Sequence, residues 1–407
     1  MKKNSFILFI VFVLTSVCSA TIQPGIWRGV LFLNEKENVE LPFNFDVAVK
    51  EGKTILIIRN AKERIEIDEV STLGDSVNFK MPVFDSEFKT KNYGDHLEGV
   101  WINHSKKDNN IIKFKAWHNQ RYRFKCPAEE PNQLFKGKWE ATFSPGTADS
   151  SKAIALINQE PTYVSATFLT ETGDYRYLEG AKHKDKLYLS CFDGAHAFLF
   201  IAKTDGINIT DGDFYSGATW HEKWTGRRND KFELLNPENI TRLKNQLDNI
   251  YFTFPDLEGK NVSLKDEKFK NKVVIIQVMG SWCPNCMDET AYLAQFYKQY
   301  KNKGLEIIAL AYEKASDPQK AKSNVLRLKT KFAADYTFLL TGLTGKDKAT
   351  ESLPALDKIT AFPTTIYIDK KGKVRKIYTG FSGPATGTEY EKFKQNNESF
   401  VANLLKE

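Results

Sequence analysis

Two cysteines separated by two residues are the part of this sequence best suited to chemistry. Cys283 and Cys286 lie in the stretch WCPNC, directly after a short apolar run. That run, Val273–Val278, is rich in β-branched residues and is followed by a glycine, so it predicts a buried parallel strand. Pro284 suits the first turn of a helix, and apolar residues recur after it at helical spacing. The sequence therefore places Cys283 where a strand passes into a helix N-terminus and Cys286 one turn inside that helix.

This placement favours thiol–disulfide chemistry. A thiol at a helix N-terminus faces unpaired N–H groups and the positive end of the helix dipole, which stabilise its thiolate. Residues three apart share a helix face, so Cys286 can reach Cys283 and close a disulfide. We expect Cys283 to be the attacking thiolate and Cys286 the resolving thiol. The alternatives are a structural disulfide and half of a zinc site, but zinc needs two more ligands, and no His follows His221 and no Cys follows Cys286.

A second motif strengthens this interpretation. Phe362-Pro363-Thr364 precedes the apolar strand Thr365–Ile368. Together with WCPNC after an apolar strand, it resembles the thioredoxin-like superfamily, and within it the TlpA/ResA-type thiol–disulfide oxidoreductases of the bacterial cell envelope. The resemblance covers residues 251–407 and implies an α/β fold around a mostly parallel sheet. It implies protein thiols and disulfides as substrates and an upstream thiol electron donor as partner, and we expect no cofactor and no metal.

The resemblance also implies roles for residues near the cysteine pair. Pro363 matches the cis-proline that thioredoxin-like folds place beside the pair, where it would present the backbone of Phe362 to the substrate; the alternative is an ordinary proline at the start of a strand. Trp282 and Phe362 are accordingly expected to bind the substrate.

Proton transfer to or from the resolving cysteine requires a further group. Thioredoxins use a buried Asp six residues before the first cysteine, but here that position is Gln277, which cannot ionise. By resemblance, Glu313 at the end of the strand Leu305–Tyr312 is the expected substitute, because strand C-terminal ends face the site in α/β sheets. The alternative is a solvent-facing Glu at the start of a loop.

Other parts of residues 251–407 predict alternating strands and helices. The expected elements are a hairpin over 252–264, the strands Leu305–Ala311, Tyr336–Leu340 and Val374–Tyr378, and the helices Asp317–Phe332, Ser352–Ile359 and Glu389–Leu405. Such an alternation is typical of an α/β domain.

The first half of the chain predicts an all-β tandem repeat, with units at 21–126 and 137–230 that form a sandwich or a barrel. The segments that correspond between the units are Gly25-Ile26-Trp27 with Gly137-Lys138-Trp139, Phe84-Asp85-Ser86 with Phe192-Asp193-Gly194, and Gly99-Val100-Trp101 with Gly217-Ala218-Thr219-Trp220. Six of the seven Trp lie here, and we expect them to fill the cores; a ligand-binding aromatic patch is the alternative. Residues 231–250 form a linker with a short helix starting near Asn236.

The N-terminus predicts export. Residues 1–20 combine Lys2-Lys3, a short apolar core and a small-residue end, which is typical of a signal peptide. A lipid anchor at Cys18 is the alternative. Without this segment the formal charge falls from +7 to +5, and no Lys/Arg block indicates nucleic-acid binding. The expected location is therefore the periplasm or cell envelope, where Cys126 and Cys191 can either pair or remain separate thiols.

Taken together, these features predict an exported thiol–disulfide oxidoreductase that reduces protein disulfides through Cys283 and Cys286. Two alternatives stay open. The β half can be a binding module for protein or glycan that carries an accessory redox domain, or the enzyme can work as a disulfide oxidase or isomerase. The sequence does not fix the direction of electron flow, because exchange through a C-x-x-C pair runs both ways.

Overall fold

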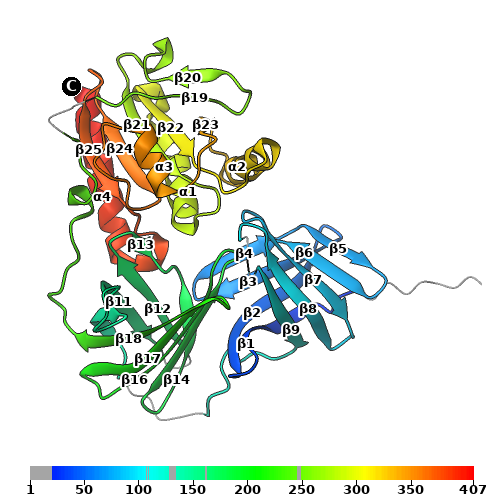
Figure 1. Cartoon of the computed structure of the whole chain (residues 1–407). Helices are drawn as coiled ribbons and strands as arrows, with labels where there is room; N and C mark the ends of the chain where they lie inside the picture. Colours follow the sequence, from blue (N-terminus) through cyan, green and yellow to red (C-terminus); the bar gives the residue numbers. More distant parts are fainter. Residues whose placement is uncertain (1–20, 107, 109, 128–133, 161–162, 245–248) are drawn as a thin grey trace, which may run out of the picture.

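The computed structural model describes residues 21–106, 108, 110–127, 134–160, 163–244 and 249–407. The expected signal peptide and Cys18 lie outside these residues. Within the described ranges, no helix has the length and apolar character needed to cross a membrane. Figure 1 shows two antiparallel β sheets formed by the first half of the chain and an α/β domain formed by the second half.

The first sheet has nine strands in the order β4-β3-β2-β1-β9-β8-β7-β6-β5. Alternation fixes which side of each strand is buried, as in β9, where Ile112, Phe114 and Ala116 are buried between more exposed neighbours. The strands are β1 (Gly25–Asn34), β2 (Val39–Lys50), β3 (Lys53–Asn60), β4 (Glu63–Ile67), β5 (Val70–Leu73), β6 (Ser76–Lys80), β7 (Ser86–Asn92), β8 (His96–Asn103) and β9 (Ile111–His118).

The second sheet closes into a barrel. Its strands follow the order β11-β10-β18-β17-β16-β15-β14-β12-β13, and β11 also pairs with β12, so every strand except β13 belongs to a closed ring. The strands are β10 (Gly137–Phe143), β11 (Ser151–Gln159), β12 (Val164–Thr170), β13 (Gly173–Asp174), β14 (Leu178–His183), β15 (Lys186–Phe192), β16 (Ala197–Thr204), β17 (Asn208–Ser216) and β18 (Trp220–Arg228).

The two sheets share one strand order, in agreement with the expected tandem repeat, because β10 to β18 neighbour one another as β1 to β9 do. Trp27 on β1 and Trp139 on β10 are both fully buried. Each donates its indole N–H to the backbone carbonyl four residues earlier, at 2.9 and 2.8 Å. The Phe84 and Phe192 turns also correspond, since they join β6 to β7 and β15 to β16.

One of the expected correspondences between the units is wrong. Trp101 lies inside β8 and is 1% exposed, whereas Trp220 begins β18 and is 54% exposed. The buried Trp of β18 is Trp224. The two segments share Gly and Trp residues, but these residues occupy different positions in the two sheets. The expectation that Trp side chains fill the cores holds for Trp27, Trp101, Trp139 and Trp224, which are at most 1% exposed.

The C-terminal domain has a five-stranded sheet in the order β23-β22-β21-β24-β25, in which β21, β22 and β23 run parallel, β24 is antiparallel to β21, and β25 is antiparallel to β24. This is the expected thioredoxin-like α/β layout. Its strands are β21 (Val273–Met279), β22 (Leu305–Ala311), β23 (Thr337–Leu340), β24 (Thr364–Ile368) and β25 (Val374–Thr379), with the hairpin β19 (Thr253–Pro255) and β20 (Asn261–Ser263) before them. The helices are α1 (Pro284–Tyr300), α2 (Pro318–Phe332), α3 (Gly345–Ser352) and α4 (Thr388–Lys406).

The predicted helix at Ser352–Ile359 is wrong. Helix α3 ends at Ser352, and the residues after it form turns and a single β-bridge between Leu356 and Leu243. Pro354 explains the difference, because the residue before a proline is disfavoured in the helical conformation. The short helix expected near Asn236 is a three-residue 3₁₀ turn, Pro237–Asn239.

Turns from both sheets pack against the C-terminal domain. Val83 and Phe84, in the turn from β6 to β7, are 5% exposed and belong to the same apolar cluster as the core around β21. Ala195, in the corresponding turn of the second sheet, packs against that cluster too. Asp85 adds an ion pair with Lys320 at the start of α2 (2.7 Å). Burial of these apolar side chains favours a fixed contact between the β half and the C-terminal domain.

A glycine marks another closely packed contact. Gly173 has a φ of +143°, and a Cβ there would lie 1.9 Å from Nδ2 of Asn285 and 3.3 Å from the carbonyl oxygen of Phe381. We expect Gly173→Ala to destabilise the protein by about 1–3 kcal/mol through overpacking and backbone strain. Denaturant unfolding of the full chain would measure this.

Gly52→Ala is the matched control. Gly52 also has a positive φ, +75°, but a Cβ there meets nothing within 4 Å. The Gly52→Ala variant therefore adds backbone strain without a steric clash. Its loss of folding stability is expected to be smaller than that of Gly173→Ala. Equal destabilisation by the two variants would show that the contact with Asn285 contributes nothing.

Candidate active site

The structure places the two cysteines at the start of α1, as the sequence predicts. Cys283 is the N-cap residue, and its sulfur accepts a hydrogen bond from the backbone N–H of Cys286 at 3.2 Å. The Cα atoms are 5.2 Å apart and the sulfurs lie at disulfide distance. Cys283 is 6% exposed and Cys286 is fully buried. The more exposed cysteine is thus the one at the positive end of the helix dipole, where a thiolate is stabilised.

Phe362 and Pro363 lie beside the pair. The Phe362–Pro363 peptide bond is cis, as expected. Sγ of Cys283 is 3.4 Å from the carbonyl oxygen of Phe362, so a loop distant in sequence reaches the reactive sulfur. Thr364 fixes this loop, because its hydroxyl donates to the carbonyl of Ala361 at 2.9 Å and its backbone starts β24.

Aromatic side chains form one wall of the site. The indole N–H of Trp282 donates to the carbonyl of Tyr312 at 3.0 Å, and its ring meets Phe362 edge-on with centroids 5.6 Å apart. Tyr312 stacks on the Phe362 ring, with the ring centroids 5.7 Å apart. Gly280 allows the Trp282 indole to pack against the backbone, since a Cβ at position 280 would lie 2.4 Å from the Trp282 indole nitrogen. Trp282 and Phe362, the expected substrate-binding residues, therefore lie together next to Cys283.

Glu313 lies two residues after the end of β22 and contacts the loop before the cysteines. It is buried and accepts hydrogen bonds from the backbone N–H and the hydroxyl of Ser281, at 2.7 and 2.6 Å. Burial raises the pKa of the Glu313 carboxyl, and the Ser281 hydrogen bonds oppose this. Within the described chain its hydrogen bonds go to Ser281 and to neither cysteine. The position agrees with an orienting role for the segment that carries Trp282.

A second buried carboxyl, which the sequence reasoning missed, lies on the same helix as the resolving cysteine. Glu289 follows Cys286 by three residues on α1 and is 1% exposed. It accepts hydrogen bonds from the Thr365 hydroxyl (2.6 Å) and from the side-chain amide of Gln277 (2.9 Å). The same amide nitrogen lies 3.4 Å from the Cys286 carbonyl oxygen. Gln277 thus joins the carboxyl to the backbone of the resolving cysteine.

Burial raises the pKa of Glu289 to about 7, against the effect of the hydrogen bonds from Thr365 and Gln277. A carboxyl in that range exchanges protons at neutral pH, which is what a general acid or base requires. The signal was present in the sequence, because a spacing of three places Glu289 on the helix face of Cys286. Burial of that face by β21 and β24 gives the carboxyl its unusual pKa, and only the structure shows it.

A cleft opens next to Trp282, between the first sheet and the C-terminal domain. Its volume is about 1630 Å³, and its walls include Lys106 and His104 on one side and Glu313, Lys314 and Trp282 on the other. The Lys314 ammonium lies 4.0 Å from the centre of the Trp282 ring, a cation–π contact. No group of three or more Cys, His, Asp or Glu in the described chain is arranged to hold a metal ion.

The C-terminal half matches a known family. Residues 247–393 match the family model described as Redoxin. The thiol-disulfide oxidoreductase ResA of Bacillus cereus is 37% identical over 141 residues, which are 35% of this chain and 73% of ResA. ResA of Geobacillus thermodenitrificans is 33% identical over 148 residues, or 36% of this chain and 73% of that protein. Against ResA of Bacillus anthracis, 36% identical over 123 residues, the chain spans 62% of the relative's length.

The chain also aligns in part with solved structures of thiol–disulfide proteins. The thioredoxin domain of a thiol-disulfide oxidoreductase from Bacteroides vulgatus is 26% identical and aligns over 37% of this chain and 99% of its own, with a TM-score of 0.28. A thiol:disulfide interchange protein of the thioredoxin family from Chlorobium tepidum is 21% identical and aligns over 37% of this chain and 96% of its own, also with a TM-score of 0.28.

Proposed function

Because the chain belongs to the ResA-type thiol–disulfide oxidoreductases through its C-terminal domain, we propose that it reduces disulfide bonds in exported proteins. One observation carries the proposal. Cys283 caps α1 within disulfide distance of Cys286, with its sulfur next to Phe362 and the cis-proline Pro363. A helix N-terminus that stabilises one thiolate and a buried partner thiol behind it are the two parts that disulfide exchange requires.

The reaction proceeds in two exchanges. The Cys283 thiolate attacks one sulfur of the substrate disulfide, forms a mixed disulfide and releases the other substrate sulfur as a thiolate. Cys286 then loses its proton and attacks Sγ of Cys283, which releases the second substrate sulfur and closes the Cys283–Cys286 bond. Two electrons pass from the cysteine pair to the substrate, and the released thiolates take up protons. An upstream dithiol partner must later reduce the pair again.

Glu289 is the proposed acceptor for the Cys286 proton. Its carboxyl shares a helix face with Cys286, and its pKa of about 7 allows it to be ionised, and thus able to accept a proton, in part of the molecules at neutral pH. Glu313 retains a proposed role in the same site, as the group that orients Ser281 and with it Trp282. Trp282, Phe362 and Pro363 form the surface that receives the substrate segment around its disulfide.

The place of action is proposed to be the periplasm or cell envelope. Support comes from the features of residues 1–20, which are typical of a signal peptide, whereas a lipid anchor at Cys18 remains the alternative. An oxidising compartment also supplies the disulfides that such an enzyme reduces.

A single-turnover assay tests the proposal. The full chain, reduced and freed of reductant, is mixed with a disulfide-bonded protein, and the thiols of both partners are counted after trapping. We expect one substrate disulfide to be reduced per Cys283–Cys286 bond formed. A reduced chain that keeps both thiols while the substrate keeps its disulfide would contradict the proposal, provided that dithiothreitol reduces the same substrate.

The cleft beside Trp282 favours a second candidate function, in which the β half binds a partner for the redox domain. Lys106, which lies between β8 and β9, and Lys314 line this cleft, and neither ammonium forms an ion pair with a carboxylate among the described residues. Burial lowers the pKa of both, and the charge of Lys106 lowers that of Lys314 further. Such a pair would be stabilised by the carboxylate of an acidic peptide segment.

Binding without redox chemistry tests this candidate. A chain with both Cys283→Ser and Cys286→Ser is titrated with an acidic peptide and with a peptide in which amides replace the carboxylates. Stronger binding of the acidic peptide, lost in Lys106→Met, would support the candidate. Equal binding of the two peptides would remove it.

A further inference from the structure

Strand β13 of the second sheet and the residues directly after it touch both residues that separate the two cysteines. Gly173 lies against the Asn285 side chain so closely that a Cβ would overlap it. Arg176, three residues further on, has its guanidinium nitrogen Nη1 3.4 Å from the carbonyl oxygen of Pro284. Asp174 accepts a hydrogen bond from the backbone N–H of Gly383 in the C-terminal domain. The β half therefore contacts the C-P-N-C segment itself and its immediate surroundings.

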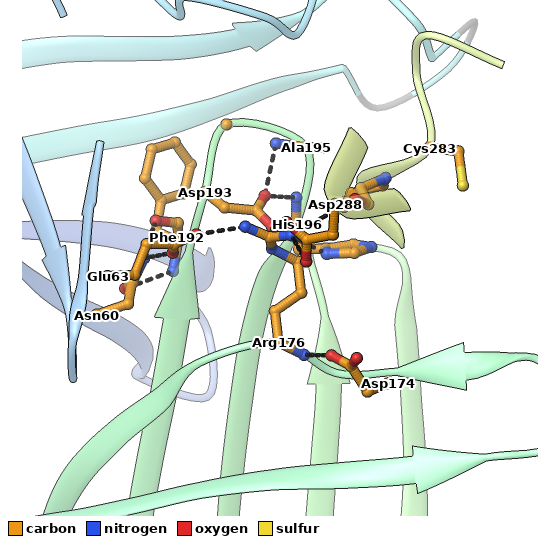
Figure 2. A network of polar contacts seen from close by, with 12 residues as sticks. Asn60, Glu63, Asp174, Arg176, Phe192, Asp193, Ala195, His196, Cys283 and Asp288 are labelled. Atoms are coloured by element: carbon orange, nitrogen blue, oxygen red, sulfur yellow. Dashed lines mark hydrogen bonds and ion pairs between the residues drawn. The ribbon is translucent and has the colours of Figure 1, made fainter. Parts of the chain in front are cut away.

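Arg176 is the centre of this contact. It is 1% exposed and forms ion pairs with three carboxylates from three parts of the chain: Glu63 on β4, Asp193 in the turn after β15 (3.1 Å) and Asp288 on α1. Figure 2 shows this network together with Cys283. Because Asp288 lies five residues after Cys283, on the first turns of the same helix, the ion pair fixes the part of α1 that carries the redox pair.

Further charged side chains contact the ion-pair network of Arg176. Asp174 hydrogen-bonds to the backbone N–H of Arg176. His196 pairs with Asp193 at 3.1 Å. Burial raises the pKa of Asp288, and the Arg176 charge opposes this shift. The cluster thus places one buried guanidinium among several carboxyls. The electrostatic potential that the cluster produces at the start of α1 depends on the charge of each of these groups.

We propose that Arg176 is a positioning residue of the redox site: the second sheet supplies a guanidinium that holds the start of α1 and, with Asp288, sets the charge next to Cys283. This inference rests on the proposed redox function and extends it, since it makes the β half part of the machinery that determines the redox potential.

The sign of the effect follows from the charge on Cys283. A positive charge near the start of α1 stabilises the Cys283 thiolate and so the reduced state, which raises the midpoint potential; a negative charge does the opposite. Arg176→Met is expected to favour the disulfide, whereas Asp288→Asn is expected to favour the dithiol. Both variants break the same ion pair, so loss of the contact alone would move the two potentials in the same direction.

The test is the equilibrium of the full chain with defined dithiothreitol buffers at pH 7, read by thiol trapping. We expect the ratio of disulfide to dithiol at a fixed buffer to rise about threefold or more in Arg176→Met and to fall by a similar factor in Asp288→Asn. Arg176→Lys, which keeps the charge, is expected to remain within about twofold of the parent chain. Glu63→Gln also removes a carboxylate from Arg176, but Glu63 lies on β4 and not on α1, so its shift is expected to be smaller than that of Asp288→Asn.

Shifts of the same sign in Arg176→Met and Asp288→Asn, or shifts below twofold in both, would overturn the proposal. If Arg176→Met does not fold, the comparison of Asp288→Asn with Glu63→Gln decides, and equal shifts in these two would overturn it as well. A parent chain whose cysteines do not equilibrate with the buffer would instead contradict the redox function itself. Failure of the inference and failure of the proposed function therefore give different results.

Discussion

Replacing Cys286 with serine is expected to stop the reaction at the mixed disulfide between Cys283 and the substrate. Cys283 keeps its place at the N-terminus of α1 and can still attack, but no thiol behind it can release the substrate. Turnover should fall by at least about 10³-fold, as expected when a group essential to the chemistry is removed. The covalent complex is measured by mass spectrometry under non-reducing conditions.

Cys283→Ser is the matched control for this prediction. It removes the more exposed sulfur and leaves Cys286, which is fully buried and out of reach of a folded substrate. Turnover is expected to be lost without accumulation of the covalent complex. If Cys283→Ser trapped substrate as well as Cys286→Ser does, the assignment of attacking and resolving cysteines would be wrong.

Glu289→Gln is expected to stabilise the protein at pH 8. Burial raises the pKa of Glu289 in the folded state to about 7, above its value in the unfolded chain. Between these values the folded state binds the proton and the unfolded state does not, so stability from this group is full below the unfolded pKa and is lost as the pH rises through about 7. Removing the charge should add up to about 3 kcal/mol at pH 8, because one pKa unit corresponds to about 1.4 kcal/mol.

Denaturant unfolding at pH 5 and pH 8 measures this effect. The difference between Glu289→Gln and the parent chain is expected to be larger at pH 8 than at pH 5. The same variant should slow the release of substrate from the mixed disulfide, because Cys286 loses its proton acceptor. A gain in stability that is equal at both pH values would show that Glu289 has no raised pKa.

The Glu313→Gln variant distinguishes the proposed role of Glu313 from that of Glu289. Glu313 accepts from Ser281, so its replacement is expected to affect substrate binding through Trp282 more than the rate of the resolving step. A resolving step slowed by Glu313→Gln and unchanged in Glu289→Gln would return the proton-transfer role to Glu313.

Local sequence patterns were sufficient to place the cysteine pair. The strand, the glycine and WCPNC placed Cys283 at a helix N-terminus, whereas the cis-proline at Pro363 was expected from the resemblance to thioredoxin-like proteins. The strand and the start of the helix are each encoded by a few adjacent residues that restrict the local backbone conformation. The prediction of a helix at Ser352–Ile359 was wrong because Pro354 disfavours the helical conformation of Leu353.

Contacts between distant residues could not be predicted in this way. Arg176 meets Asp288 across 112 positions of sequence, and Gln277 reaches Glu289 from a different element. The sequence shows the charge of such a side chain but not its burial, and burial determines whether a carboxyl keeps its ordinary pKa. The repeat was recognised, but one correspondence failed because Trp101 and Trp220 have the same letter and different environments.

The midpoint potential of the Cys283–Cys286 pair in the full chain tests the central claim most directly. The chain is equilibrated with dithiothreitol and with glutathione buffers, and the reduced fraction is measured after thiol trapping. The account predicts complete, reversible cycling with a midpoint below about −220 mV, in the range of thioredoxin and glutaredoxins and suited to a reductase. A midpoint near about −120 mV would identify an oxidant and contradict the proposed direction of electron flow, and a pair that does not cycle would be a structural disulfide.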